Sequence, residues 1–247
     1  MPPPLAELMA IARLDEATLV ADQRGTRRDA LYGLLRREQA IFAAGQRSPS
    51  EVSRILDLAQ AAYGDVVGAL VGRNDRLLDT ARDGDWSLRD VLRHAIAVEL
   101  RYAAQIEYSA TRAESEPIEI PIARLPCDRL SPPEPAFAAS RTGGVLEQLR
   151  LLGEARVGSD IRLAKLPDSV LTRPSMWGNR PLDVRMRIHQ IAVHLTETTI
   201  QIDRIVLSGG ELRAIIRRIC ITRGMHERWS PAHGRTALDE SYAALSR

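Results

Sequence analysis

The sequence predicts an all-α protein built on a four-helix bundle, with an extra N-terminal helix and a short C-terminal helix. Four long segments, roughly 51–80, 87–111, 145–165 and 181–207, carry apolar residues at the three-, four- and seven-residue spacing of one helix face. Charged residues make up 27% of the chain and aromatic residues only 4%, which is typical of a soluble helical protein. A long proline-rich stretch between the second and third segments can cross one end of a bundle.

The first 47 residues are predicted to form an accessory helical segment, with a break near 23–28. One apolar face is formed by Leu31, Leu34, Leu35, Ile41 and Phe42. The same segment carries a cluster of arginines, namely Arg24, Arg27, Arg28, Arg36 and Arg37. Because no base-reading motif accompanies them, a solvated face is a better interpretation than a nucleic-acid contact. We expect this segment to pack across the bundle.

The first two bundle helices are predicted to begin after the break at 47–50 and at Ser87. In the first, Gly64, Gly68 and Gly72 recur every four residues, which fits either a close approach of two helices or a weak, kinked helix. In the second, Ser87 and Asp90 resemble a capping box.

The region 114–144 carries six prolines, which exclude a continuous helix. A connection of this length lets the third bundle helix run parallel to the second, and it can also cover the mouth of a pocket. The third helix is predicted at about 145–165. A loop follows at 166–180 and carries Met176, Trp177, Gly178 and Asn179.

The fourth bundle helix is one unbroken pattern, and the rest of the chain is organised around it. It is predicted to run from Pro181 to Leu207, a length of about 40 Å. Proline suits the first turn of a helix, and Gly209–Gly210 would end it. A shorter helix is predicted at 211–224, followed by a polar tail. We therefore divide the chain into an N-terminal segment (1–47), the bundle (48–210) and a C-terminal helix with its tail (211–247).

Two histidines are predicted to face the interior of the bundle. His94 lies beside Val91 and Val98 on the apolar face of the second helix, and His194 shares a face with Ile191 and Thr198 on the fourth. An inward histidine on a core helix is either a hydrogen-bonded core residue or a metal ligand. The other three, His189, His226 and His233, are interpreted as surface or loop residues.

The composition excludes several classes of protein. A net charge of +2 argues against a dedicated polyanion binder. The N-terminus lacks the features of a signal peptide, and no apolar run approaches the ~20 residues of a membrane span. The two cysteines, Cys127 and Cys220, show neither metal-ligand spacing nor a redox pair, which favours a reduced, cytoplasmic setting.

Two motifs together resemble the DinB/YfiT-like superfamily of four-helix bundles. The first runs from Asp85 to His94 (DWSLRDVLRH) and is followed by Glu99. The second is His194 on the late helix, followed by TIQIDR at 199–204. The resemblance covers about 51–207 and implies an up-down-down-up bundle.

The resemblance implies a divalent-metal site, often for zinc or nickel, and activity that is largely thiol-dependent. Its members include mycothiol- or bacillithiol-linked transferases and a maleylpyruvate isomerase. In this family, one histidine of the second helix and a His-x-x-x-His pair of the fourth bind the metal, with Glu-x-x-x-His replacing the pair in the isomerase. His94 matches the first ligand and His194 the first member of the pair, but Thr198 occupies the second position. If His194 is taken as the last ligand, Gln190 occupies the earlier position. Neither alignment completes the triad.

Glu197 offers a third ligand, because it follows His194 by three residues on the same helix. His94, His194 and Glu197 would then form a His₂Glu metal site with an open position for water or a thiolate. The alternative is that Glu197 is solvated. In that case the metal is lost, and a pocket remains in which Thr198 and Gln190 hydrogen-bond a ligand. Loop residues Trp86, Met176 and Trp177 are candidates for its mouth.

Three functions follow from these features. The first is a divalent-metal-dependent transferase or hydrolase, with a thiol cosubstrate. The second is a metal-free bundle that binds a small molecule or a protein partner. A nucleic-acid role, suggested only by the arginine-rich segments, ranks last. Packing through helix faces also allows a homodimer.

Overall fold

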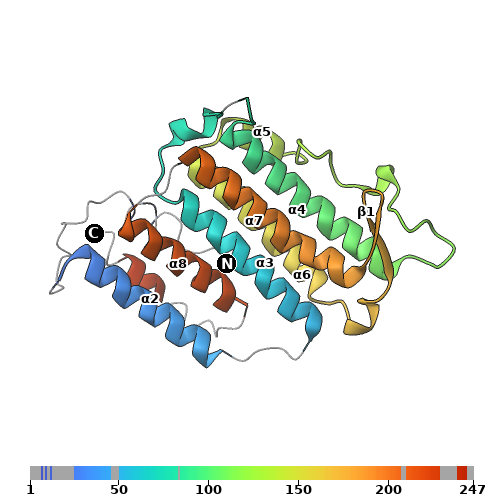
Figure 1. Cartoon of the computed structure of the whole chain (residues 1–247), viewed down its shortest axis with the longest axis horizontal. Coiled ribbons are helices and arrows are strands. Elements are labelled where there is room, and N and C mark those ends of the chain that lie inside the picture. Colours follow the sequence, from blue (N-terminus) through green and yellow to red (C-terminus); the bar gives the residue numbers. More distant parts are fainter. Residues whose placement is uncertain are drawn as a thin grey trace.

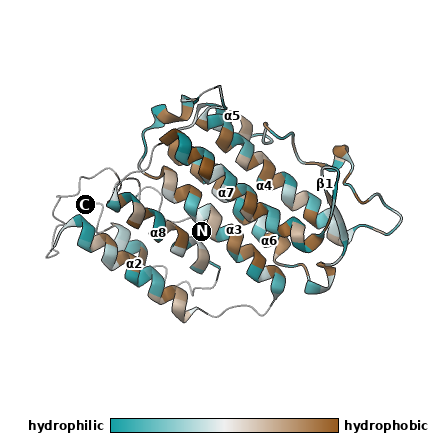
Figure 2. Cartoon of the chain, in the orientation of Figure 1, coloured by the Kyte–Doolittle hydropathy of each residue, from teal (hydrophilic) through white to brown (hydrophobic). Residues whose placement is uncertain are grey.

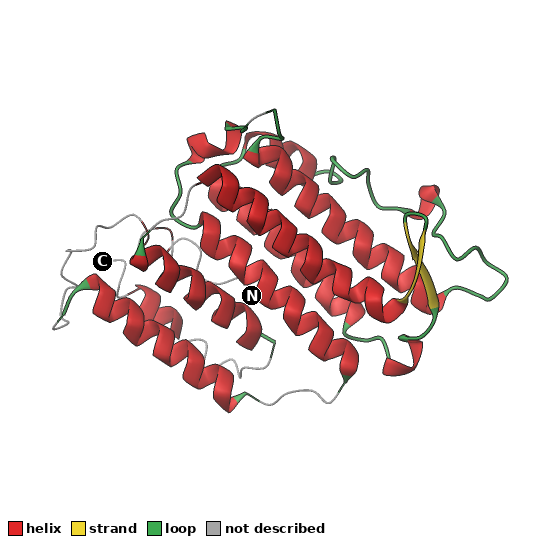
Figure 3. Ribbon diagram, viewed as in Figure 1, coloured by secondary structure: helices red, strands yellow, loops and turns green. Residues whose placement is uncertain are grey.

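The computed structural model describes residues 25–45, 50–82, 84–206, 210–228 and 238–243, together with Glu7, Met9 and Ala12. The predicted all-α class is confirmed (Figure 3). The helices are α2 (Arg27–Ala44), α3 (Glu51–Leu70), α4 (Leu88–Thr111), α5 (Ala136–Thr142), α6 (Val145–Leu163), α7 (Val184–Val206) and α8 (Glu211–His226). Short 3₁₀ helices span Asp75–Asp79, Ile122–Arg124 and Asp168–Val170, and a hairpin is formed by β1 (Pro174–Trp177) and β2 (Arg180–Asp183).

Helices α3, α4, α6 and α7 form the predicted four-helix bundle. Helix α7 packs against both α3 and α4, and α6 packs on their other side (Figure 1). At one end, Arg185 in the first turn of α7 donates to Glu51 in the first turn of α3 at 2.6 Å. Arg162 and Glu107 likewise join the last turns of α6 and α4. Helix α3 is therefore parallel to α7, and α4 is parallel to α6. This arrangement gives the predicted up-down-down-up order.

One hydrophobic core runs through the bundle and continues under α8. Each bundle helix alternates between hydrophobic and hydrophilic residues along its length (Figure 2). Leu56, Leu92, Leu152, Ile188 and Ile219, one from each of five helices, are all completely buried. Burying a side chain of this size stabilises the fold by about 1.5–3 kcal/mol. None of the described helices combines the length and the hydropathy that crossing a membrane requires.

The glycines of α3 mark a close approach to α8, the first of their two predicted roles. A Cβ atom on Gly64 would overlap the backbone at Cys220, and one on Gly68 would lie 2.6 Å from the Cα of Arg217. In return, a Cβ on Gly224 of α8 would lie 2.5 Å from the carbonyl oxygen of Gln60. Helix α2 packs on α8 from outside, so α8 lies between α2 and α3.

The prediction that the first bundle helix continues to residue 80 is wrong. Helix α3 ends at Leu70, because Gly72 adopts a positive φ of 74° that a continuing helix does not allow. Asn74 then begins a 3₁₀ helix, and its side chain accepts a hydrogen bond from the Arg76 amide at 2.9 Å.

The start of the last bundle helix was also misplaced. Pro181 lies in β2, where it pairs with Met176 of β1, and α7 begins three residues later at Val184. The two strands are joined by Gly178 and Asn179, with Gly178 at φ 59°, so part of the predicted loop is a tight hairpin. Residues 207–209, where this helix was expected to end, lie outside the described residues.

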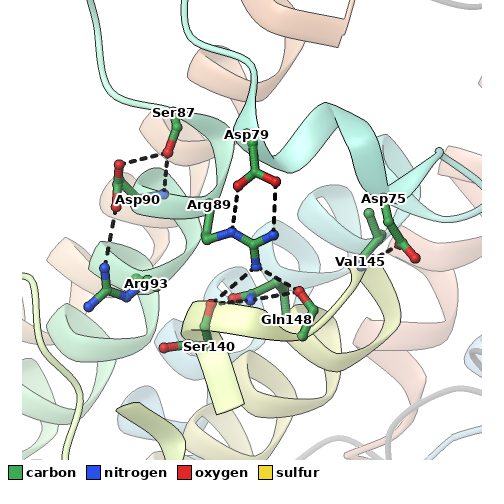
Figure 4. A network of polar contacts seen from close by, with 10 residues as sticks. Asp75, Asp79, Ser87, Arg89, Asp90, Arg93, Ser140, Val145 and Gln148 are labelled. Atoms are coloured by element: carbon green, nitrogen blue, oxygen red, sulfur yellow. Dashed lines mark hydrogen bonds and ion pairs between the residues drawn. The ribbon is translucent and has the colours of Figure 1, made fainter. Parts of the chain in front are cut away.

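A polar network holds the start of α4 in place (Figure 4). Arg89 donates to the Asp79 carboxylate and to the carbonyl oxygen of Gly143, both at 2.7 Å. Ser87 caps the helix, because its hydroxyl accepts a hydrogen bond from the amide of Asp90 at 3.1 Å. These contacts connect α4 to the 3₁₀ helix before it and to the start of α6. They fix the helix whose second turn carries His94.

The prediction that His226 is a surface residue is wrong, because α2 covers that face of α8. His226 is completely buried and contacts the buried carboxylate of Glu38 on α2. The same carboxylate accepts a hydrogen bond from the hydroxyl of Tyr242. His189 is half-buried, as suits a residue pointing away from the pair, whereas His233 lies outside the described residues.

The arginine cluster of the N-terminal segment is only partly solvated. Arg36 and Arg37 are exposed, and Arg28 pairs with Glu211, but Arg27 is buried. Arg24 lies outside the described residues, as does the proposed segment boundary at 47. The division at 47 and 210 stays a prediction.

Candidate functional site

The structure brings the rings of His94 and His194 together inside the bundle. His94 comes from the second turn of α4 and His194 from the middle of α7, two helices that pack against each other. Their ring centroids are 5.0 Å apart, and the ring planes are inclined at 70°. This edge-to-face arrangement is typical of paired aromatic rings.

Two further aromatic rings extend the pair on either side. Trp86 lies 5.0 Å from His94, and Tyr102 lies 5.8 Å from His194, both measured between ring centroids. Trp177 of the hairpin donates from its indole nitrogen to the Tyr102 hydroxyl at 3.2 Å. Both predicted tryptophans therefore belong to this cluster, and both are partly exposed, with 45% of Trp86 and 37% of Trp177 accessible to solvent.

Both imidazoles are uncharged near neutral pH. Burial lowers the pKa of His94, and burial together with the nearby His94 lowers the pKa of His194 to about 4. The Nδ1 atom of His94 lies 2.7 Å from the carbonyl oxygen of Arg129. Because a carbonyl only accepts, Nδ1 carries the proton and donates, which leaves the Nε2 lone pair of His94 as an acceptor.

The histidine pair lies between two cavities, and His94, His194 and Glu197 line both. One cavity, of about 300 Å³, lies on the Trp86 side and is also lined by Thr198. The other, of about 460 Å³, lies on the Tyr102 side and is also lined by Trp177. Gln190 lines neither of them.

The expected third metal ligand does not join the two imidazoles. Glu197 is exposed, although it lines both cavities beside the two histidines. Thr198 is buried, but its hydroxyl donates to the carbonyl oxygen of His194 at 2.8 Å. Across the described ranges, no group of three or more His, Cys, Asp and Glu residues could hold a metal ion. Since zinc sites usually have at least three protein ligands, the donors present do not fit such a site.

Searches of known proteins return one structural likeness. No protein-family model matches the chain, and no curated protein matches its sequence. The chain is similar to YfiT from Bacillus subtilis. The solved structure of YfiT is described as "a probable metal-dependent hydrolase with an unusual four-helix bundle topology". The match to YfiT has a TM-score of 0.46 and 19% identity, and it covers 65% of this chain and 86% of YfiT.

Sequence patterns did not identify Tyr102, Arg129 and Arg187 as site residues. Tyr102 lies about two turns after His94 on the same helix, and Arg187 about two turns before His194. Arg187 lies beside Val184 and Ile188 and interrupts the apolar face of α7. This interruption is the sequence feature that could have identified it. Arg129 belongs to the proline-rich connection, whose path over His94 has no local sequence signature.

Proposed function

We propose that this protein binds a small organic molecule on both sides of the His94–His194 pair, without a metal ion held by three protein ligands. The observation that carries the proposal is the position of two uncharged imidazoles on the wall shared by two cavities. Cavities of about 300 and 460 Å³ suit a small ligand, since ligand pockets generally measure about 300–1,000 Å³.

The residues around the pair suit an aromatic or partly apolar ligand. Trp86 and Trp177 offer flat apolar surface at the two mouths, and their partial exposure leaves them accessible. His94 offers an acceptor at Nε2, because its Nδ1 proton is held by the carbonyl of Arg129. An oriented polar group of this kind fixes the orientation of a ligand. A neutral imidazole in this position could also take a proton from the ligand, as a general base does.

A second candidate is a divalent-metal-dependent transferase or hydrolase, with His94, His194 and Glu197 as ligands of zinc or nickel and with a thiol cosubstrate. One observation favours it. Metal-binding histidines usually donate their second ring nitrogen to a carbonyl or carboxylate, as His94 does to Arg129. This candidate ranks second, because the described residues contain no group of three His, Cys, Asp or Glu side chains that could hold a metal ion.

The test compares ligand binding with and without metal in the full chain. Chelator-treated protein, labelled so that histidine ring signals are visible by NMR, is titrated with the neutral aromatic probes benzamide and indole. We expect the His94 and His194 signals to shift in the absence of metal. Trp86→Ala should weaken binding about tenfold, the loss expected for one aromatic contact. Ile161→Ala, a matched change at an exposed apolar residue of α6, should leave it unchanged.

Two results would favour the other candidate or overturn the proposal. If the ring signals respond only after zinc or nickel is added, the metal-dependent candidate replaces this one. If no probe moves either ring while the protein is folded, the cavities beside the histidines are not a binding site.

A further inference from the structure

We infer that the cavity on the Tyr102 side binds an anionic group of the ligand, a carboxylate or a phosphate, and that Arg187 is its principal partner. The inference rests on the proposed function, because it names the class of molecule that the same site would take.

Arg187 is a buried cation that has no counter-ion among the described residues. It is 1% exposed, lines the Tyr102-side cavity, and forms none of the ion pairs found among the described residues. Its Nη2 atom donates to the side-chain oxygen of Gln105, and its guanidinium carbon lies 4.0 Å from the centre of the Tyr102 ring. Its Nε and Nη1 atoms have no hydrogen-bond partner among the described residues. Nε and Nη1 point to different sides of the guanidinium, so each can donate one hydrogen bond to an anionic oxygen, although the two do not form a bidentate fork.

An unpaired charge at this depth is unfavourable, since burial removes it from water. Burial lowers the pKa of Arg187, the neighbouring charge of Arg101 lowers it further, and Tyr102 partly opposes this. Two other arginines that are at most 2% exposed are paired, whereas Arg112, at 8%, donates to carbonyl oxygens. Arg156 contacts Glu99, and Arg223 lies 2.8 Å from Asp239. The exception at Arg187 therefore points to a partner that comes from outside the chain.

Most of the remaining charges of this cavity are also positive. Arg101, Arg129 and Arg180 also line it, and none of them forms an ion pair with a described residue. Arg101 donates instead to the carbonyl oxygen of Cys127 at 2.6 Å. The single acidic side chain in the lining is the exposed Glu197. Four guanidinium groups around one small space make its potential strongly positive, which attracts and orients an anion.

The Trp86-side cavity has no such excess. Its arginines, Arg82 and Arg204, are balanced by Asp85 and Glu197. Arg204 lies 3.3 Å from Asp85, so part of this charge is already compensated within the protein. The difference in charge between the two cavities predicts how the ligand is oriented. Its anionic group lies on the Tyr102 side, and its uncharged body lies past the histidine pair on the Trp86 side.

The experiment uses three probes of similar shape and different charge on the full chain. Benzoate carries a carboxylate, phenyl phosphate carries a phosphate, and benzamide is the neutral counterpart of benzoate. Affinities are measured by calorimetry, with the His94 and His194 ring signals as reporters of the site. We expect at least one anion to bind about tenfold or more tightly than benzamide. The better of the two anions identifies the natural head group.

Variants assign this preference to Arg187. In Arg187→Gln, we expect the advantage of the anion over benzamide to fall about tenfold or more. Arg187→Lys keeps the positive charge but lacks the planar guanidinium, so it should retain part of the preference for the anion. The control is Arg162→Gln, which removes an exposed arginine of α6 paired with Glu107. If Arg187→Gln fails to fold, the double change Arg129→Gln/Arg180→Gln at exposed positions should still reduce the preference.

The inference and the proposed function fail in different ways. Anions that bind no tighter than benzamide, or a preference that survives both sets of arginine changes, would overturn the inference. If benzamide still shifts the two histidine rings, the proposed function stands. If no probe shifts them, the proposed function fails as well.

Discussion

The imidazole rings of His94 and His194 meet edge to face with their centroids 5.0 Å apart, although a hundred positions separate the two residues in the chain. The contact depends on the packing of α7 against α4, and it places two uncharged nitrogen heterocycles on the wall between two cavities. Both rings line both cavities, so a molecule bound in either would lie beside them.

Introducing a third imidazole should create the metal site that the native residues do not complete. Thr198 lies one helical turn after His194, is buried, and lines the cavity that both histidines border. We expect Thr198→His to bind Zn²⁺ at least about tenfold more tightly than the native protein, because three protein donors replace two. Equilibrium dialysis against a zinc buffer measures the change. Adding His94→Ala to that variant should remove the gain, and a gain that persists would place the metal elsewhere.

Stability should fall as the pH drops below the ordinary pKa of histidine. The pKa of His194 is lowered to about 4 in the folded protein, so above pH 6.5 the residue is neutral in both states. Below that pH the unfolded chain takes up the proton first, which favours unfolding. By this linkage His194 alone reduces the free energy of unfolding by about 2 kcal/mol at pH 5. Urea unfolding at pH 7.5 and pH 5 measures it.

The control for this pH effect is His194→Gln, which lacks the titrating group. The difference in stability between the two pH values should be smaller in this variant. Equal differences in the two proteins would mean that His194 titrates normally. His94 contributes in the same direction, since burial also lowers its pKa.

The buried ion pair between Glu99 of α4 and Arg156 of α6 should be sensitive to losing one partner. Both residues are almost inaccessible, and burial raises the pKa of Glu99 despite the charge of Arg156. Arg156→Met would leave a buried carboxylate unpaired and should destabilise the protein by about 3–5 kcal/mol. Urea unfolding gives the value. The matched change at the exposed pair of α4 and α6, Arg162→Met, should remove less than about 1 kcal/mol.

The close contact of α3 and α8 should not tolerate a side chain at Gly64. A Cβ atom there would overlap the backbone at Cys220, so Gly64→Ala should destabilise the protein by about 1–3 kcal/mol. It should also speed the reaction of the buried Cys220 thiol with a labelling reagent. Gly158→Ala in α6, where nothing lies within 4 Å of the added atom, should be neutral or stabilising. Similar stabilities for both variants would contradict the observed packing.

Periodicity predicted the bundle well because its helices bury one face each. The predicted limits of the second and third bundle helices agree with α4 and α6 to within two residues. The end of α3 was missed because it depends on the backbone conformation of Gly72. The hairpin was missed because its four-residue strands are too short for an alternating pattern. His226 was misassigned because its burial depends on α2, nearly two hundred residues earlier in the chain.

The site was predictable only in part, because its contacts join residues that are far apart in the chain. The inward direction of His94 and His194 follows from their own helices, whereas the contact with Tyr102 and Arg187 depends on how α4 and α7 are aligned. Alignment is set by packing across the whole interface, which neither segment encodes alone. The exposure of Glu197 likewise depends on the rotation of α7 within the bundle.

The most direct test of the central claim is a crystal structure of the full chain grown with both benzoate and Zn²⁺ present. We expect density for benzoate beside the His94–His194 pair, with its carboxylate within hydrogen-bond distance of the Arg187 guanidinium. We expect no zinc ion held jointly by His94, His194 and Glu197. A zinc ion bound by those three side chains, or benzoate found only outside both cavities, would contradict it.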